Sequence, residues 1–175
     1  MKPLIVYYSF SGNNEFIAKL LKQKLNCDIR KVEEVKKRTG ITILLDVLFK
    51  RKPKVREPEI PLTQYDKIIL VAPVWNGRIA SPMESFIEME REHFKTYSFL
   101  TVCSGAEGQI EKVTDELYRL ALKNPDTVAE LKINDLLPPE QKGKIIYATP
   151  YRIKEKDMPV FEKRIESFLW AIGAR

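Results

Sequence analysis

Apolar residues in this chain occur in short continuous runs that alternate with segments of helical periodicity. The first run, residues 4–8 (LIVYY), has the composition of a strand buried on both faces. After a short polar stretch, apolar residues recur from Phe16 to Leu25 at the spacing of an amphipathic helix, with lysines on its other side. The first 25 residues are therefore predicted to form a strand, a tight polar turn and a helix.

The same alternation continues to the end of the chain. Further strands are expected at residues 28–32, 67–74, 97–103 and 128–133. Helices are expected at residues 82–92 and 109–122 and after Pro159, and a second apolar run, residues 144–151, follows the fifth strand. Apolar strands that alternate with helices are typical of a parallel sheet covered on both faces, and right-handed crossovers make such a sheet doubly wound. We therefore predict a single α/β domain, residues 1–175, with a doubly wound five-stranded parallel sheet of order 2-1-3-4-5 and helices on both faces.

This topology places the loops after the first, third and fourth strands at one edge of the sheet, where doubly wound proteins bind ligands. The loops are residues 9–14 (SFSGNN), 73–82 (PVWNGRIASP) and 103–108 (CSGAEG), and each is polar and contains glycine. We expect them to line one crevice.

The first loop has the features of a phosphate site without a lysine or arginine. Gly12 lets the backbone approach a ligand closely, and the helix that follows starts with N–H groups that lack intrahelical partners. Such a helix start binds phosphate, and the hydroxyls of Ser9 and Ser11 and the amides of Asn13 and Asn14 would add donors. An ordinary capped turn uses the same residue types, so this loop alone supports both interpretations.

Two segments resemble the flavodoxin family. IVYYSFSGNNEFIAKLL resembles the phosphate-binding segment of that family, a strand followed by a [ST]-x-[ST]-G-x-[TN] turn and a helix. The match includes Ser9, Ser11, Gly12 and Asn13, and it is weaker at Asn14, where the family usually has threonine. IILVAPVWNGRIASPMESFIE is similar to the third-strand segment of the family, in which the strand leads into Pro-x-Trp/Tyr-x-Gly and then a proline and a helix. With the CSGAEG loop, the resemblance spans most of the domain.

The resemblance implies a flavodoxin-like fold and noncovalently bound FMN, with the phosphate at the first loop and the isoalloxazine ring between the second and third loops. Trp75 is the expected ring contact, because a flat aromatic side chain stacks on a flat flavin. The alternative is that Trp75 packs in the hydrophobic core. Asn76 and Gly77 would place a peptide group near the reactive nitrogen of the flavin. The predicted cofactor-binding residues are Ser9, Phe10, Ser11, Gly12, Asn13, Asn14, Pro73, Val74, Trp75, Asn76, Gly77, Cys103, Ser104, Gly105 and Gly108. No catalytic residue and no metal site is predicted.

The sequence lacks the motifs of other protein classes that have similar folds. The sequence contains neither a GxxxxGK[ST] nucleotide loop nor a G-x-S-x-G hydrolase elbow. A receiver domain has acidic residues after the first strand and an aspartate after the third, where this chain has Tyr8-Ser9 and Ala72-Pro73. A cysteine phosphatase has an arginine in the loop after its cysteine, and CSGAEGQ has none.

Three hypotheses for the function stay open. The first is an electron-transfer protein that serves a redox partner protein, and the second is a quinone reductase that uses NAD(P)H and a small acceptor. The third is a binding module without flavin, because Asn14 departs from the family pattern and the third loop lacks the aromatic that many flavodoxins place against the outer ring face.

The positive charge of the chain is concentrated in one segment. Residues 36–56 contain eight basic residues and one acidic residue, a net charge of +7 against +6 for the whole chain, so the remainder carries −1. Within this segment, residues 39–54 (TGITILLDVLFKRKPK) are predicted to form an amphipathic helix that either covers the sheet or docks an acidic partner. Nucleic acid is not the expected partner, because no aromatic interleaving or recognised module accompanies the charge.

Size and composition place the protein in a broad class. With 175 residues, the chain suffices for one packed domain and is short for two. It contains no run of roughly 20 apolar residues and no recognisable leader, so a soluble protein in the cytoplasm is expected. Cys27 and Cys103 lie in apolar runs and are expected to be reduced thiols, and His93 is expected at an exposed helix end.

Overall fold

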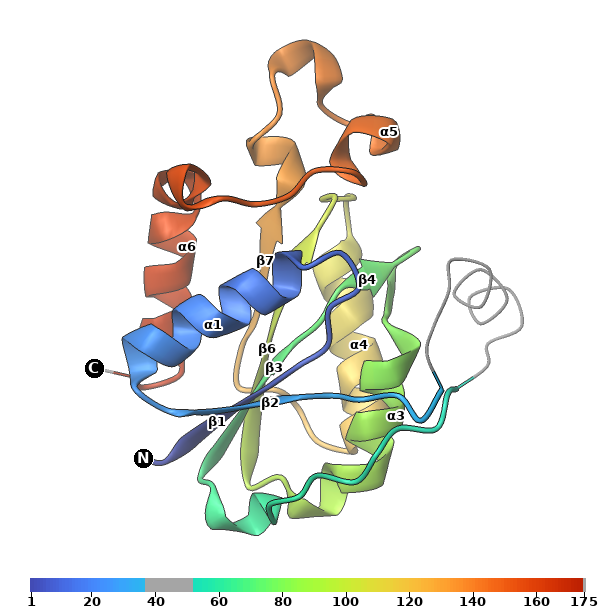
Figure 1. The fold of residues 1–175 in the computed structure, drawn as a ribbon, viewed down its shortest axis with the longest axis vertical. Helices are drawn as coiled ribbons and strands as arrows, with labels where there is room; N and C mark the ends of the chain where they lie inside the picture. Colours follow the sequence, from blue (N-terminus) through green and yellow to red (C-terminus); the bar gives the residue numbers. More distant parts are fainter. Residues whose placement is uncertain (37–51, 175) are drawn as a thin grey trace.

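The computed structural model describes residues 1–36 and 52–174 (Figure 1). Its centre is a parallel sheet of β1 (Pro3–Tyr7), β2 (Asp28–Lys31), β3 (Lys67–Val71), β6 (Thr96–Cys103) and β7 (Val128–Lys132). The spatial order is β2-β1-β3-β6-β7, which is 2-1-3-4-5 when the strands of this sheet are numbered along the chain. The predicted fold class and strand order are confirmed.

Helices cover both faces of the sheet (Figure 1). The longer helices are α1 (Asn13–Leu25), α3 (Ser81–Glu90), α4 (Gln109–Ala121) and α6 (Met158–Ala171). Leu4 and Val6 of β1 belong to the core cluster that contains residues of α3 and α4, whereas Ile5 belongs to the cluster that contains residues of α1 and α6. Successive side chains of a strand point to opposite faces, so a sheet covered on both sides needs apolar residues at every position. This is why the strands are continuous apolar runs in the sequence.

Short helical turns lie between these elements. They are η1 (Leu62–Gln64), η2 (Arg91–His93), η3 (Ile133–Asp135), η4 (Pro139–Gln141), α5 (Ile145–Ala148) and η5 (Glu155–Asp157). His93 is exposed at the end of η2, as predicted. Among the residues that the structure describes, no helix has the length and apolar character that a membrane crossing requires.

One predicted strand ends earlier than expected, and one apolar run for which no element was predicted forms a short helix. The third strand ends at Val71 and not at residue 74, and a separate antiparallel hairpin follows, made of β4 (Val74–Trp75) and β5 (Arg78–Ile79). The apolar run at residues 144–151 forms α5, in which Ile145 and Ile146 are each 72% exposed. A short apolar run has no periodicity that distinguishes a buried element from one at the edge of a cleft.

The two ends of the basic segment lie against each other. The N–H of Val35 donates to the carbonyl of Lys54 at 3.0 Å, and the N–H of Arg56 donates to the carbonyl of Glu33 at 2.8 Å. Most of the helix predicted at residues 39–54 lies outside the described residues, and residues 52–54 are not helical. The docking of an acidic partner on this segment stays a prediction.

Candidate functional site: a cleft at the carboxyl edge of the sheet

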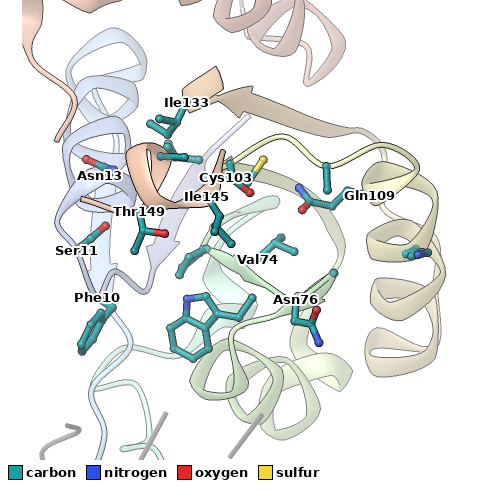
Figure 2. A pocket seen from close by; sticks show the side chains of 18 of the residues that line it. Phe10, Ser11, Asn13, Val74, Asn76, Cys103, Gln109, Ile133, Ile145 and Thr149 are labelled. Carbon is teal, nitrogen blue, oxygen red and sulfur yellow. The ribbon is translucent and has the colours of Figure 1, made fainter. Parts of the chain in front are cut away.

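A cleft of about 540 Å³ lies at the carboxyl ends of β1, β3 and β6 (Figure 2). All three predicted loops contribute to its walls. Of the predicted residues, those that line it are Phe10, Ser11, Asn13, Pro73, Val74, Trp75, Asn76, Gly77, Cys103 and Ser104. Those that do not are Ser9, Gly12, Asn14, Gly105 and Gly108. The volume lies within the range of about 300 to 1,000 Å³ that small-molecule sites occupy.

The first loop forms a tight turn from β1 into α1. The Oγ of Ser9 accepts a hydrogen bond from the N–H of Gly12 at 3.1 Å. Gly12 precedes the helix with a φ of 94°, a left-handed conformation that costs a residue with a Cβ about 1 to 2 kcal/mol. A Cβ at Gly12 would meet no atom within 4 Å, so the backbone angle and not crowding requires glycine there. The first turn of α1, with its N–H groups that lack intrahelical partners, thus begins at the cleft.

The side chains of Asn13 and Asn14 hold the loop in place. Asn14 is 2% exposed, and its Nδ2 donates to the carbonyl of Val102 while its Oδ1 accepts the N–H of Val102, at 3.3 and 2.9 Å. Asn13 makes the equivalent pair with the carbonyl of Tyr151 and the N–H of Ile153, at 2.9 and 3.0 Å. The Asn14 side chain is buried between α1 and β6 and does not line the cleft, so its amide serves the scaffold in this structure, and its predicted contact with a ligand stays a prediction. Asn13 does line the cleft and stays a candidate.

The second loop is the β4–β5 hairpin. Its turn residues, Asn76 and Gly77, have φ angles of 51° and 75°, as two-residue hairpin turns of the favoured hand require. Trp75 lies directly before the turn and packs edge-on against Tyr8, with ring centroids 6.0 Å apart and ring planes at 80°. The indole is thus supported by the residue after β1 and also lines the cleft.

The third loop begins at a buried thiol. The Sγ of Cys103 donates to Oε2 of Glu130 at 3.6 Å, and the side chain of Gln109 also donates to Glu130, at 3.3 Å. Burial, and then the negative charge of Glu130, raises the pKa of Cys103 to about 12. Because the thiolate is the reactive form, the raised pKa disfavours nucleophilic chemistry at Cys103, whose side chain forms part of the cleft wall. Both cysteines are free thiols, as predicted.

A fourth segment that the sequence patterns did not identify completes the cleft. Ile133, Ile145, Ala148 and Thr149 come from the chain after β7 and line the cleft together with the three loops. Figure 2 shows Ile133, Ile145 and Thr149 among the lining side chains. The remaining unpredicted lining residues are Val102, Ala106, Glu107, Gln109 and Lys112. One signal was available: the apolar run at residues 144–151 follows the fifth strand and so leaves the sheet at the same carboxyl edge.

Solved structures share this architecture. A candidate flavoprotein from Bacteroides eggerthii superimposes with a TM-score of 0.70 over 99% of both chains, at 16% sequence identity. A flavoprotein from Lactobacillus acidophilus in complex with FMN has a TM-score of 0.65 at 19% identity and covers 74% of this chain and 92% of its own. A candidate flavoprotein from Bacteroides uniformis has a TM-score of 0.64 at 19% identity, covering 83% of this chain and 97% of its own. The chain has the flavodoxin-like fold. No protein-family model matches the sequence, and no curated protein matches it significantly.

The cleft occupies the expected place in a flavodoxin-like fold. Ligands of such folds bind where the strand order reverses, between β1 and β3, outside the carboxyl ends of the strands. Here β1 pairs with both β2 and β3, and the loops that follow β1 and β3 both line the cleft.

Cys103 is expected to resist alkylation in the native protein. Raising the pKa from 9.0 to about 12 lowers the thiolate fraction at neutral pH by about a thousandfold. We expect iodoacetamide to label Cys103 of a Cys27→Ser variant quickly in urea and very slowly under native conditions, as followed by mass spectrometry. Equal labelling rates in the two conditions would contradict the burial of this thiol.

Proposed function

We propose that the protein is an FMN-binding flavoprotein that transfers electrons, with FMN in the cleft at the carboxyl ends of β1, β3 and β6. The observation that carries the proposal is the convergence of three loops on one cleft: the Ser9–Gly12 turn, the Trp75 hairpin and the loop after β6. A protein of the same fold from Lactobacillus acidophilus was crystallised in complex with FMN. Bound FMN would supply the redox chemistry, because a flavin accepts and returns electrons.

The first loop fits the phosphate end of such a cofactor. The hydroxyl of Ser11 and the unpaired N–H groups at the start of α1 are donors, and the positive end of the helix dipole favours an anion. The hydroxyl of Ser9 accepts from Gly12 and keeps its own proton to donate. Thr149, from the segment after β7, adds a further hydroxyl to the cleft (Figure 2).

A cation from the segment after β7 lies near the first turn of α1. Nη1 of Arg152 donates to the carbonyls of Thr149 and Tyr151, at 3.1 and 3.0 Å. The carbonyl of Tyr151 also accepts from Asn13 in the first turn of α1. Arg152 therefore lies near the first turn of α1, and its positive charge would favour a phosphate bound there, although its side chain does not line the cleft.

The second loop fits the flavin ring. Trp75 presents a flat aromatic side chain to the cleft, and the turn Asn76-Gly77 presents backbone groups that can donate to or accept from a ring nitrogen. Gly77, with its φ of 75°, also gives this peptide freedom to reorient. These residues would orient the ring and limit the access of water to it.

A second candidate function is reduction of a quinone or a similar small acceptor by NAD(P)H. It is favoured by the open outer side of the cleft. The loop after β6 contributes Ser104, Ala106 and Glu107 there but no aromatic, and Ile145 on the segment after β7 is mostly exposed. A carrier needs only an exposed flavin edge and a redox partner protein, whereas a reductase needs room for a nicotinamide and an acceptor as well.

Reconstitution with FMN tests these proposals. The purified protein is mixed with FMN and desalted, and its visible spectrum is recorded before and after addition of NAD(P)H. We expect the protein to retain the flavin colour. Bleaching by NAD(P)H alone supports the reductase, and a coloured protein that does not react supports the carrier. A colourless product would contradict FMN binding. Of the three hypotheses for the function, only the binding module without flavin would then remain.

Trp75 is expected to contribute strongly to FMN affinity. In Trp75→Ala the ring loses its aromatic contact, so the dissociation constant should rise by about tenfold, measured by quenching of FMN fluorescence on titration. Trp170→Ala is the matched control, because Trp170 is 68% exposed on α6 and does not line the cleft. Equal affinities of the Trp75→Ala variant and the wild type would show that the ring does not lie on Trp75.

A further inference from the structure

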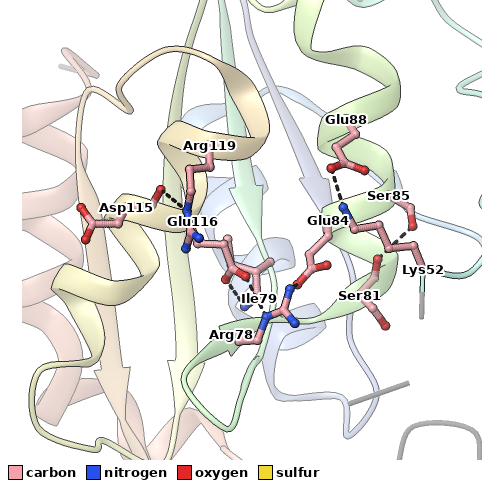
Figure 3. Close-up of polar contacts among 10 residues, drawn as sticks. All are labelled: Lys52, Arg78, Ile79, Ser81, Glu84, Ser85, Glu88, Asp115, Glu116 and Arg119. Carbon is pink, nitrogen blue, oxygen red and sulfur yellow. Dashed lines mark hydrogen bonds and ion pairs between the residues drawn. The ribbon is translucent and has the colours of Figure 1, made fainter. Parts of the chain in front are cut away.

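The hairpin that carries Asn76 and Gly77 is tied to two helices by one arginine (Figure 3). Nε of Arg78 donates to Oε1 of Glu116 at 3.1 Å, and its Nη2 donates to Oε1 of Glu84 at 3.0 Å. The second carboxylate oxygen of Glu116 accepts the N–H of Ile79 at 2.7 Å. Glu84 belongs to α3 and Glu116 to α4, so these bonds join β5 to both helices on that face of the sheet.

The two carboxylates are buried, which makes this arrangement unusual. Glu84 is 3% exposed and Glu116 is 6% exposed. A buried carboxylate is costly unless it is paired and hydrogen-bonded, and here two of them share a single guanidinium. With both ionised, the cluster carries a net charge of −1, and one proton makes it neutral.

Among the described residues, the charged side chains beside the cluster are Lys52, Lys112 and Arg119 and the carboxylates of Glu88 and Asp115. Lys52 lies nearby but forms its own ion pair with Glu88 of α3. On α4, Arg119 donates to the backbone carbonyl of Asp115 (Figure 3).

The cluster is connected mechanically to the cleft. Arg78 and Trp75 are cross-strand partners in the β4–β5 hairpin, and Asn76 and Gly77 form the turn between them. Trp75, Asn76 and Gly77 all line the cleft, whereas Arg78, Glu84 and Glu116 do not. A shift of the Arg78 side chain therefore moves a lining turn without any direct contact between the cluster and a ligand.

We propose that Arg78, Glu84 and Glu116 are positioning residues that hold the Asn76–Gly77 turn at the cleft, and that one proton on the carboxylate pair sets how firmly they hold it. The positioning role stands on the hydrogen bonds and burial of this cluster. Its consequence for flavin rests on the proposed function.

The proton is exchanged near neutral pH. Burial, followed by the charge of Glu116, raises the pKa of Glu84 to about 7, while Arg78 and Lys52 act in the opposite direction. Below this pH, a protonated Glu84 leaves the cluster neutral and the hairpin tightly held. Above it, ionised Glu84 still pairs with Arg78 but repels the buried carboxylate of Glu116, and the uncompensated buried charge favours separation of the two carboxylates and entry of water beside the hairpin. The added negative charge also opposes the binding of an anionic cofactor.

The first experiment needs no flavin. In a Trp170→Phe background, Trp75 is the sole tryptophan of the chain, and its fluorescence reports the hairpin. We expect the emission maximum of the flavin-free protein to shift between about pH 6 and pH 8 with a midpoint near the pKa of Glu84, as solvent reaches the indole. Glu84→Gln, which keeps the shape but cannot ionise, should abolish the shift. An emission maximum that does not change with pH in the Trp170→Phe protein would overturn the proposal.

Two further variants separate positioning from general stability. Arg78→Lys keeps the positive charge but lacks the planar fork that reaches two carboxylates, so it should leave Trp75 in its loosened state at every pH. Arg119→Gln is the matched control, since it removes a cation of α4 whose hydrogen bond goes to Asp115 and not to the hairpin, and it should behave as the wild type. Equal effects of Arg78→Lys and Arg119→Gln on the emission maximum would overturn the proposal.

The second experiment measures the consequence for the cofactor. The FMN dissociation constant of the wild type should rise by about fivefold or more from pH 6 to pH 8, whereas that of Glu84→Gln should rise less. Riboflavin, which has no phosphate, is titrated in parallel and should show the same difference between the two proteins. If riboflavin and FMN bind both proteins with identical pH dependence, the link between the cluster and the cleft is wrong. If the wild type binds neither flavin, the proposed function fails, and the Trp75 experiment still decides the positioning role.

Discussion

Asn14→Ala is expected to lower the free energy of unfolding by about 3 kcal/mol. The Asn14 side chain makes two hydrogen bonds with the backbone of Val102, at 2.9 and 3.3 Å, and is 2% exposed. Alanine removes both bonds and leaves a backbone N–H and a carbonyl unpaired in a buried place, at about 1 to 3 kcal/mol for each. Urea unfolding followed by circular dichroism measures the difference.

Ser11→Ala is the control for this variant. Ser11 lies in the same loop but has a surface position, so its replacement should change stability by less than about 0.5 kcal/mol. Similar stabilities for Asn14→Ala and Ser11→Ala would show that the contact with Val102 does not hold α1 against β6. The comparison also bears on the family pattern, because the residue that departs from it serves the scaffold and not the cleft.

The free energy of unfolding should fall by about 2 kcal/mol as the pH rises from about 5 to about 8, because of Glu84. Its pKa is raised from 4.5 to about 7 in the folded protein. Between these two values the folded state binds a proton that the unfolded state has released, so stability decreases with rising pH through this window. The contribution is fully present below the unfolded pKa and is lost as the pH passes the folded pKa. Urea unfolding at a series of pH values measures the slope.

Glu84→Gln is the control that assigns the slope to this side chain. Glutamine keeps the size of the side chain and an oxygen that accepts from Arg78, but it does not titrate. The variant should show a flatter stability profile than the wild type over the same range. Glu15 and Asp66, whose pKa values are lowered mainly by hydrogen bonds from Lys19 and from the backbone of Lys2, titrate at pH values below this window. A slope that persists unchanged in Glu84→Gln would show that another group causes it.

Much of the scaffold could be predicted from the local pattern of residues. The runs at residues 4–8 and 97–103 are apolar at nearly every position because each strand is covered on both faces. Few sheet topologies are compatible with such strands alternating with amphipathic helices, because the crossovers are right-handed. The strand order then determines which loops meet, so the convergence of residues 9–14, 73–77 and 103–104 followed from the chain order of strands and helices.

The local pattern was not sufficient where a residue type serves two purposes. Asn13 and Asn14 are equally good donors in the sequence, but α1 packs against β6 so that Asn14 faces the backbone of Val102. The run at residues 144–151 is apolar like a strand. It nevertheless lies at the edge of the cleft, where the Ile145 side chain is mostly exposed to solvent. In both cases the deciding contact involves a distant part of the chain.

By itself, the sequence determined the fold class, the strand order and the three loops that meet at the cleft, because these follow from periodicity and chain order. Only the tertiary structure showed that Arg152 lies near the first turn of α1 and that Arg78 joins two buried carboxylates from different helices. The physical reason is that hydrophobic periodicity records which face of an element is buried. Pairing between charged groups depends on distances across the folded chain, which no local pattern encodes.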